Sequence, residues 1–151
     1  MNKMQELPWD NPRFGNWIAV VQAQKAIARA LAKALEPFDL KIVQLDLMMN
    51  LFRHPGASQN DIAQRLLVGR SNITMLLPPL EEQGLIRREG DEKDKRILRL
   101  YLTPAGEAKL REALKAYSTL IDRVMSQSTP EQCDAMGDVM RRVSDMLAAD
   151  D

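Results

Sequence analysis

Residues 58–106 contain two short helical patterns followed at once by two extended segments, and this order restricts the chain to few folds. Apolar residues recur from Ile62 onward, and again from Ile73 to Leu80 at the spacing of one helix face. Residues 97–102 then alternate leucines with other side chains, which is the period of a strand with one buried face. We therefore predict a helix-turn-helix followed by a β-hairpin, or wing, in a mainly α-helical protein.

Local signals mark the ends of these elements. Ser58 stands three residues before Asp61, the spacing of a capping box at a helix start. Gly84 suits the left-handed position that follows the second helix. Residues 90–96, between the two strands, are too polar to bury and form the predicted tip of the hairpin.

The exposed side of the second helix and the hairpin tip carry side chains suited to DNA. Asn and Arg make bidentate hydrogen bonds to base edges, and cations suit phosphates or the minor groove. Asp94 is expected to pair with a neighbouring cation and support the wing. Taken alone, the helix pair could be a small helical hairpin with a solvated polar face, and the charged tip could be a solvated loop. The expected DNA-contacting residues are Arg70, Ser71, Asn72, Thr74, Met75, Lys93, Lys95 and Arg96.

The segment from about residue 40 to residue 106 resembles the winged helix-turn-helix of the MarR (multiple antibiotic resistance regulator) family. An Asp-x-Arg wing followed by Leu-Thr-x-x-Gly, at this distance from the helix pair, is a specific combination. The resemblance implies a dimeric bacterial transcription regulator, often a repressor released by a small ligand. The matching residues are Gln44, Gln59, Ile62, Ala63, Leu66, Val68, Arg70, Ser71, Ile73, Thr74, Leu80, Glu81, Gly84, Leu85, Asp94, Arg96, Leu102, Thr103 and Gly106.

Three features depart from the family pattern. Pro78 and Pro79 stand where polar or basic residues are usual in the recognition helix, Gly69 replaces a common capping Ser, and Met75 replaces a frequent Arg. These changes affect target sequence and affinity more than fold. Because interior prolines remove helix hydrogen bonds, we predict a second helix that is bent or locally opened but not lost.

The chain has no net charge overall, but its basic residues are unevenly distributed. The 151 residues include 21 basic and 21 acidic ones, for a formal net charge of +0. Basic residues nevertheless gather in the helix-turn-helix and wing, and DNA binding through such a patch depends on salt.

Helical patterns flank the module on both sides. We expect an N-terminal dimerisation region (residues 1–36), a winged helix-turn-helix (37–103) and C-terminal dimerisation helices (104–151). Their apolar surface exceeds what one small domain covers, which favours a homodimer over a monomer with a helical cap. A two-fold dimer suits a palindromic operator.

A small aromatic or anionic effector is a further expectation, since the family is often ligand-responsive. A packed core would show the same aromatic and methionine residues. We expect no metal site and no cofactor, because no His, Cys and carboxylate cluster has ligand spacing. The possible pocket residues are Trp17, Met48, Met49, Phe52, His54 and Tyr117.

The sequence thus predicts a DNA-binding transcriptional regulator that is not an enzyme and has no membrane segment. With one cysteine, Cys133, it has no internal disulfide. A bacterial cytoplasmic, nucleoid-associated location follows from this reading. The alternative is a winged helix used as a protein-protein interaction module without specific DNA binding, which the basic wing disfavours.

Overall fold

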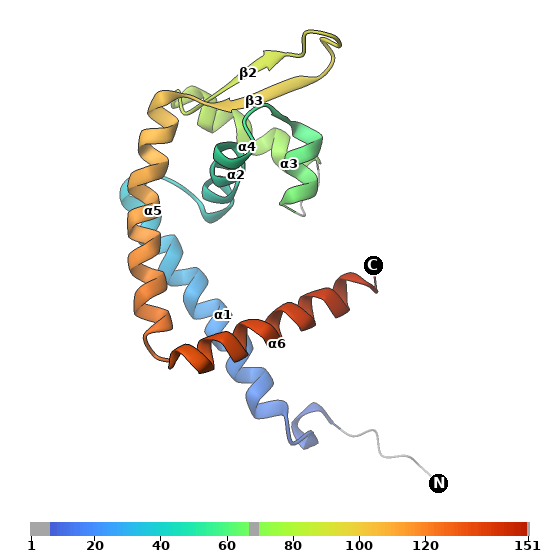
Figure 1. The fold of residues 1–151 in the computed structure, drawn as a ribbon, viewed down its shortest axis with the longest axis vertical. Helices are drawn as coiled ribbons and strands as arrows, with labels where there is room; N and C mark the ends of the chain where they lie inside the picture. The colour runs from blue at the N-terminus through green and yellow to red at the C-terminus, as the bar shows by residue number, and fades with distance from the viewer. Residues whose placement is uncertain (1–6, 67–69, 151) are drawn as a thin grey trace. The chain divides into compact units, whose positions relative to one another are not determined.

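The computed structural model describes residues 7–66 and 70–150, without the side chains of Arg70 and Ser71. It confirms the predicted class, a mainly helical protein with a small β wing (Figure 1). In chain order the elements are η1 (Pro8–Asp10), α1 (Phe14–Leu35), η2 (Glu36–Phe38), α2 (Ile42–Arg53), β1 (Ala57–Ser58), α3 (Gln59–Arg65), α4 (Arg70–Glu82), β2 (Ile86–Gly90), β3 (Leu98–Leu102), α5 (Pro104–Met125) and α6 (Pro130–Ala148).

Contacts within the chain divide it into two compact units, Met1–Tyr117 and Ser118–Asp151. The first contains the helix pair α3 and α4, the sheet, and the helices that precede them. The second contains the end of α5 and all of α6. Each unit is described by itself.

The core of the first unit is built from apolar side chains that come from all of its main elements. Helices α1, α2, α3, α4 and α5 and strand β3 each contribute at least one residue that is less than a tenth exposed. This packing fixes the rotation of each helix about its own axis, because its apolar stripe must face inward. The core includes Leu31, Leu35, Leu45, Leu47, Met48, Leu51, Ile62, Ile73, Leu77, Leu80, Leu100, Leu110 and Ala113.

The sheet has three antiparallel strands in the order β1-β3-β2. Strands β2 and β3 form the predicted hairpin, with Arg88 opposite Leu100. The additional strand β1 pairs with the other side of β3, where Ala57 lies opposite Leu100. Leu100, flanked on both sides, is fully buried, whereas Leu98 near the hairpin tip is 37% exposed. The sequence did not predict β1, because two residues carry no periodic signal.

The C-terminal end of α4 is closed by a Schellman motif. Gly84 has a left-handed φ of 69°. Its amide donates to the Glu81 carbonyl at 2.9 Å, and the Leu85 amide donates to the Leu80 carbonyl at 2.9 Å. The glycine satisfies the final carbonyls and turns the chain directly into β2.

Helix α4 continues through both of its prolines. Pro78 and Pro79 lie inside the Arg70–Glu82 span and cannot donate backbone hydrogen bonds. The neighbouring Leu77 and Leu80 are fully buried, so core packing supports the helix where these bonds are missing. The prediction that the helix is not lost is confirmed, and its bend stays a prediction.

The second unit contains α6, whose start is capped. The Thr129 hydroxyl accepts from the Gln132 amide at 3.2 Å, and the Gln132 side chain accepts from the Thr129 amide at 3.0 Å. None of the α6 residues is buried. Cys133, half-buried near the start of α6, is a free thiol whose Sγ lies 3.9 Å from Met125 Sδ.

Candidate nucleic-acid interface

The outer face of α4 is defined by what its inner face buries. Ile73, Leu77 and Leu80 are fully buried. Asn72 and Thr74 are therefore held on the exposed side, and Met75 is 76% exposed. A helix that presents such side chains over its first two turns has the form of a recognition helix.

The start of this helix is only partly described. Arg70 and Ser71 are the first two residues of α4, but their side chains lie outside the described part of the structure. The same is true of the predicted turn at Val68 and Gly69.

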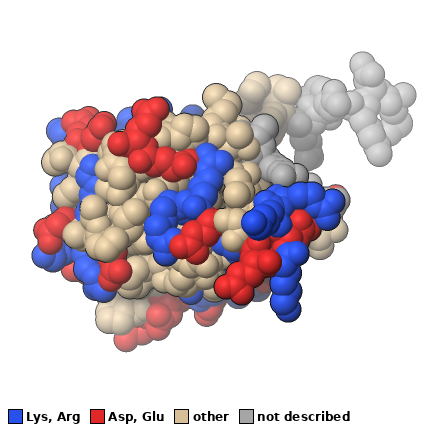
Figure 2. Space-filling model, turned by 90° about the horizontal axis from the view of Figure 1, so that it is seen from above, with Lys and Arg blue, Asp and Glu red and all other residues tan. Residues whose placement is uncertain are grey.

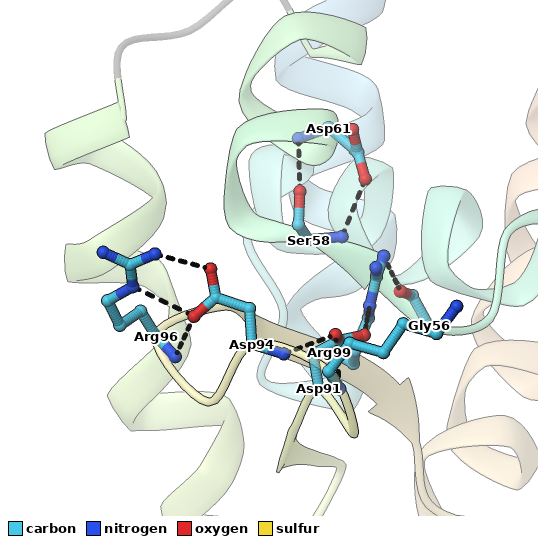
Figure 3. Close-up of polar contacts among 8 residues, drawn as sticks. Gly56, Ser58, Asp61, Asp91, Asp94, Arg96 and Arg99 are labelled. Atoms are coloured by element: carbon cyan, nitrogen blue, oxygen red, sulfur yellow. Dashed lines mark hydrogen bonds and ion pairs between the residues drawn. The ribbon is translucent and has the colours of Figure 1, made fainter.

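Helix α3, which packs against α4, begins at the predicted capping box. The Asp61 amide donates to Ser58 Oγ at 3.1 Å, and the Ser58 amide donates to the Asp61 carboxylate at 2.9 Å (Figure 3). The Ser58 amide holds the pKa of Asp61 below its usual value, with a further contribution from the Ser58 side chain. The cap fixes where α3 starts relative to β1 and hence relative to the wing.

At the tip of the wing, Asp94 binds Arg96 through three hydrogen bonds. The Arg96 amide and Nε donate to Asp94 Oδ1 at 3.1 and 3.0 Å, and Arg96 Nη2 donates to Oδ2 at 3.0 Å. The Arg96 side chain nevertheless stays 90% exposed. This contact lowers the pKa of Asp94 and raises that of Arg96, so both groups are charged at neutral pH. A cation held in one orientation and open to solvent is suited to an anionic partner.

The start of the wing loop is held by a second acidic residue, Asp91. Its carboxylate accepts from the Lys93 and Asp94 amides at 3.1 and 3.0 Å, and from Arg99 Nε at 3.1 Å. Arg99 Nη1 in turn donates to the Gly56 carbonyl at 3.2 Å (Figure 3). These hydrogen bonds, the one from the Asp94 amide first, lower the pKa of Asp91. Asp91 and Arg99 thus connect the wing to the turn before β1.

The sequence did not single out Asp91 or Arg99 for this role. Arg99 alternates with the leucines of β3, so its position away from the inner face was predictable. Its partners were not, because Gly56 lies 43 residues away along the chain.

The charges around the wing are mixed. Figure 2, viewed from the side of the hairpin in Figure 1, shows Lys and Arg interspersed with Asp and Glu. Arg87 pairs with Glu89, and Arg88 pairs with Glu81. Lys93 and Lys95 are exposed near the wing tip beside Arg96. Cations at the tip, more than a continuous basic surface, are therefore what this face offers to a phosphate backbone.

Comparison with known proteins shows which family this geometry resembles. The model of the MarR family matches residues 38–97, which span α2, the helix pair and the wing up to the start of β3. Over 102 residues the chain is 29% identical to the transcriptional repressor MdtR of Bacillus subtilis, covering 68% of this chain and 66% of that protein. The central part of the chain is therefore similar to the MarR family. The match spans just under two thirds of the relative's length.

Solved structures agree with this similarity. The structure of the transcriptional repressor CouR bound to a 23-mer DNA duplex superimposes with a TM-score of 0.79 at 28% identity, covering 83% of this chain and 89% of CouR. AbsC, a MarR-family regulator from Streptomyces coelicolor, has a TM-score of 0.82 at 22% identity, covering 89% and 93% of the two chains. The likeness to AbsC supports the fold alone.

The residues suggested for an effector pocket have different environments. Met48 is fully buried in the core, whereas Trp17 is 62% exposed on α1. Phe52 is 43% exposed at the end of α2, with the Arg111 guanidinium 5.3 Å from its ring centroid. Tyr117 is half-buried.

Met49 and His54 lie near the side of α3. Met49 lines a hollow of about 290 Å³, and the pKa of Asp46 in its wall is raised by burial. His54 caps the end of α2 and is exposed, with Nε2 3.2 Å from Arg65 Nη1. The other residues that line the hollow are Asn50, Arg53, Arg65 and Leu66.

Residues 7–66 and 70–150 lack two other features, a metal-binding cluster and a membrane-spanning helix. This part of the chain contains no group of three His, Cys, Asp or Glu side chains placed to hold a metal ion. Its helices also include none with the length and apolar character needed to cross a membrane.

Proposed function

We propose that this protein is a sequence-specific DNA-binding transcriptional regulator that represses from a palindromic operator as a homodimer. The observation that carries the proposal is the pairing, within one compact unit, of an outward-facing α4 with a wing whose Arg96 is oriented by Asp94. The relative MdtR is named a transcriptional repressor, and CouR is a repressor bound to duplex DNA. The proposal assigns the chain no enzymatic activity and places it in the bacterial cytoplasm, at the nucleoid.

The contacts divide by position on the module. The first two turns of α4 enter the major groove, where Arg70, Asn72 and Thr74 contact base edges and Ser71 contacts a base or a phosphate. At the wing, Lys93, Lys95 and Arg96 contact the phosphate backbone or the minor groove. Asp94 acts through Arg96 and does not face the phosphates itself.

The homodimer is proposed from apolar side chains that remain exposed on α6 and α1. On α6 they recur at three- and four-residue intervals, the pattern of a packing stripe. Two copies related by a two-fold axis would place the recognition helices roughly 34–36 Å apart, one turn of the duplex. The side chains are Trp17, Val20 and Ile27 on α1 and Met136, Val139, Met140, Val143, Met146 and Leu147 on α6. Sedimentation as a stable monomer at micromolar concentration would contradict the dimer.

The domain division belongs to the same proposal. Residues 37–103 form the DNA-binding module, and residues 1–36 and 104–151 supply the dimerisation helices.

A small aromatic or anionic effector would regulate this dimer by binding one spacing of the two modules better than the other. A thermal-shift screen of small molecules identifies compounds that bind the protein, and operator affinity is then measured with each of them. An effector is a compound that changes operator affinity.

The test of the function is salt-dependent DNA binding by wild-type protein and two arginine variants. Arg96→Ala should weaken binding to all duplexes and reduce the salt slope by about 1, as expected for the loss of one phosphate contact. Arg141→Ala is the matched control, because Arg141 is also an exposed arginine paired with a carboxylate, Asp138, at 2.6 Å. It lies on α6, on the side away from the apolar stripe, and should leave binding unchanged.

The competing function is a protein-protein interaction module, which the acidic residues at the wing and the prolines of α4 favour. It predicts no measurable affinity for random or promoter duplexes even at low salt. Identical behaviour of the Arg96→Ala and wild-type proteins would show that the wing does not touch DNA.

A further inference from the structure

Met75 has the highest exposed fraction among the large apolar side chains that the structure describes, at 76%. Most of the other exposed apolar side chains lie on α1, α5 and α6. On α4, by contrast, Met75 lies among polar neighbours, with Asn72 one turn before it and Thr74 beside it, both exposed. Its exposure therefore requires an explanation separate from the stripes on the other helices.

The packing of α4 shows that this exposure is built in. Ile73 and Leu77, two positions before and after Met75, are both fully buried. At 100° per residue, a side chain midway between two core residues of this spacing points away from the core. Rotating Met75 inward would expose Ile73 and Leu77 together, so its outward position is fixed by the core of the first unit.

The chemistry of the side chain limits what it can contact. A thioether has no charge and no hydrogen-bond donor, so it cannot bind a phosphate or donate to a base edge. The major groove offers one apolar group to such a side chain, the 5-methyl of thymine. Methionine is long and flexible, and therefore adapts to a methyl group without a demanding geometry.

We propose that Met75 reads thymine in the major groove through its 5-methyl group and is thus a specificity-determining residue. This inference rests on the proposed DNA-binding function and adds the base that this position selects. Pro78, exposed one turn later on the same side of α4, extends the apolar strip along the groove. The operator should therefore carry an A·T pair at the position that faces Met75 in each half-site.

A single chemical change in the DNA tests the proposal. Wild-type protein first selects duplexes from a random-sequence library. The selected sequence is then synthesised with either thymine or uracil at the A·T pair of each half-site that Met75 is proposed to face. Uracil keeps the hydrogen-bonding edges and lacks only the methyl group. Fluorescence anisotropy should show binding weakened about fourfold for each methyl lost, or about fifteenfold over two half-sites.

Two variants assign that loss to the side chain. Met75→Gln keeps length and helix propensity but replaces the apolar end with an amide, and should bind thymine and uracil duplexes equally. Met75→Leu keeps an apolar end and should retain the preference for thymine. Because position 75 is largely exposed, neither change should alter the helical circular dichroism spectrum.

The outcomes distinguish a failure of the Met75 contact from a failure of the proposed DNA binding. Equal affinity of wild-type protein for thymine and uracil duplexes would overturn the role of Met75 and leave DNA binding intact. An undiminished thymine preference in Met75→Gln would assign the methyl contact to another residue, and also overturns it. If wild-type protein selects no duplex at low salt, the proposed function itself fails, and Met75 instead belongs to a protein-binding surface.

Discussion

Gly106→Ala should destabilise the first unit strongly, although alanine is the better helix former. Gly106 is the third residue of α5, and a Cβ there would lie 1.9 Å from the Leu85 carbonyl oxygen and 2.8 Å from the Leu85 carbonyl carbon. The obstruction is main chain and cannot rotate away. The start of α5 would have to retreat from Leu85 by roughly 1.5 Å to restore normal contact.

That retreat acts on a set of contacts around Thr103. The Thr103 amide donates to the Leu85 carbonyl at 3.0 Å, and its hydroxyl donates to the Gly84 carbonyl at 2.5 Å and accepts from the Gly106 amide at 3.0 Å. Each such bond contributes about 0.5–1.5 kcal/mol, and overpacking costs about 1–3 kcal/mol. Replacing a helix glycine with alanine stabilises the helix by at most about 1 kcal/mol. The free energy of unfolding should therefore fall by about 2–4 kcal/mol.

Urea unfolding followed by circular dichroism, at one protein concentration, measures this change. With a slope of about 1–3 kcal/mol per molar urea, the midpoint should fall by about 1 M or more. Gly137→Ala is the matched control inside α6, where the new Cβ meets only the flexible end of Arg141 at 3.2 Å. It should leave stability unchanged or raise it by up to about 1 kcal/mol. An unchanged midpoint for Gly106→Ala would refute the reasoning.

Three further outcomes are expected. Asp61→Ala should lower the urea midpoint at pH 7, and this difference from wild type should narrow as pH falls below 3.8. The Ser58 amide lowers the folded-state pKa of Asp61, so the stability that the Asp61 carboxylate contributes is lost as it protonates. A difference that does not change with pH would contradict this. Arg99→Leu should release the start of the wing loop, so hydrogen exchange of the wing amides should quicken while exchange in α2 stays the same. Equal protection in both proteins would show that the arginine does not hold the wing. Replacing Pro78 and Pro79 together with Ala restores two helix amides and should raise the free energy of unfolding by about 1–3 kcal/mol in urea titrations, and a lower midpoint would mean that the prolines fit the native helix without strain.

Features governed by near neighbours were predictable from the sequence. The cap of Ser58 with Asp61, the left-handed Gly84 and the apolar stripe through Ile73 and Leu77 each depend on residues within a turn or two. Local rules of capping and periodicity determine such features, and the structure has them where the sequence placed them.

Features that depend on distant partners were not predictable. Strand β1 exists only because Ala57 meets Leu100 across the sheet. Strand periodicity predicts that Arg99 points away from the buried face, but it does not predict the contacts of Arg99 with Gly56 and Asp91. The same holds for the suggested effector pocket, since core packing and pocket lining give Met48 the same periodicity, and burial alone places it in the core.

The strand order β1-β3-β2 has a consequence for how the protein behaves in a crowded cell. Its two sheet edges are β1 and β2, and an open edge is a template on which another chain can add a strand. Strand β1 has only two residues, too few to guide such an addition. Strand β2 is longer, but Arg87, Arg88 and Glu89 line it with charge. The wing therefore stays exposed for its partner without recruiting other wings into aggregates.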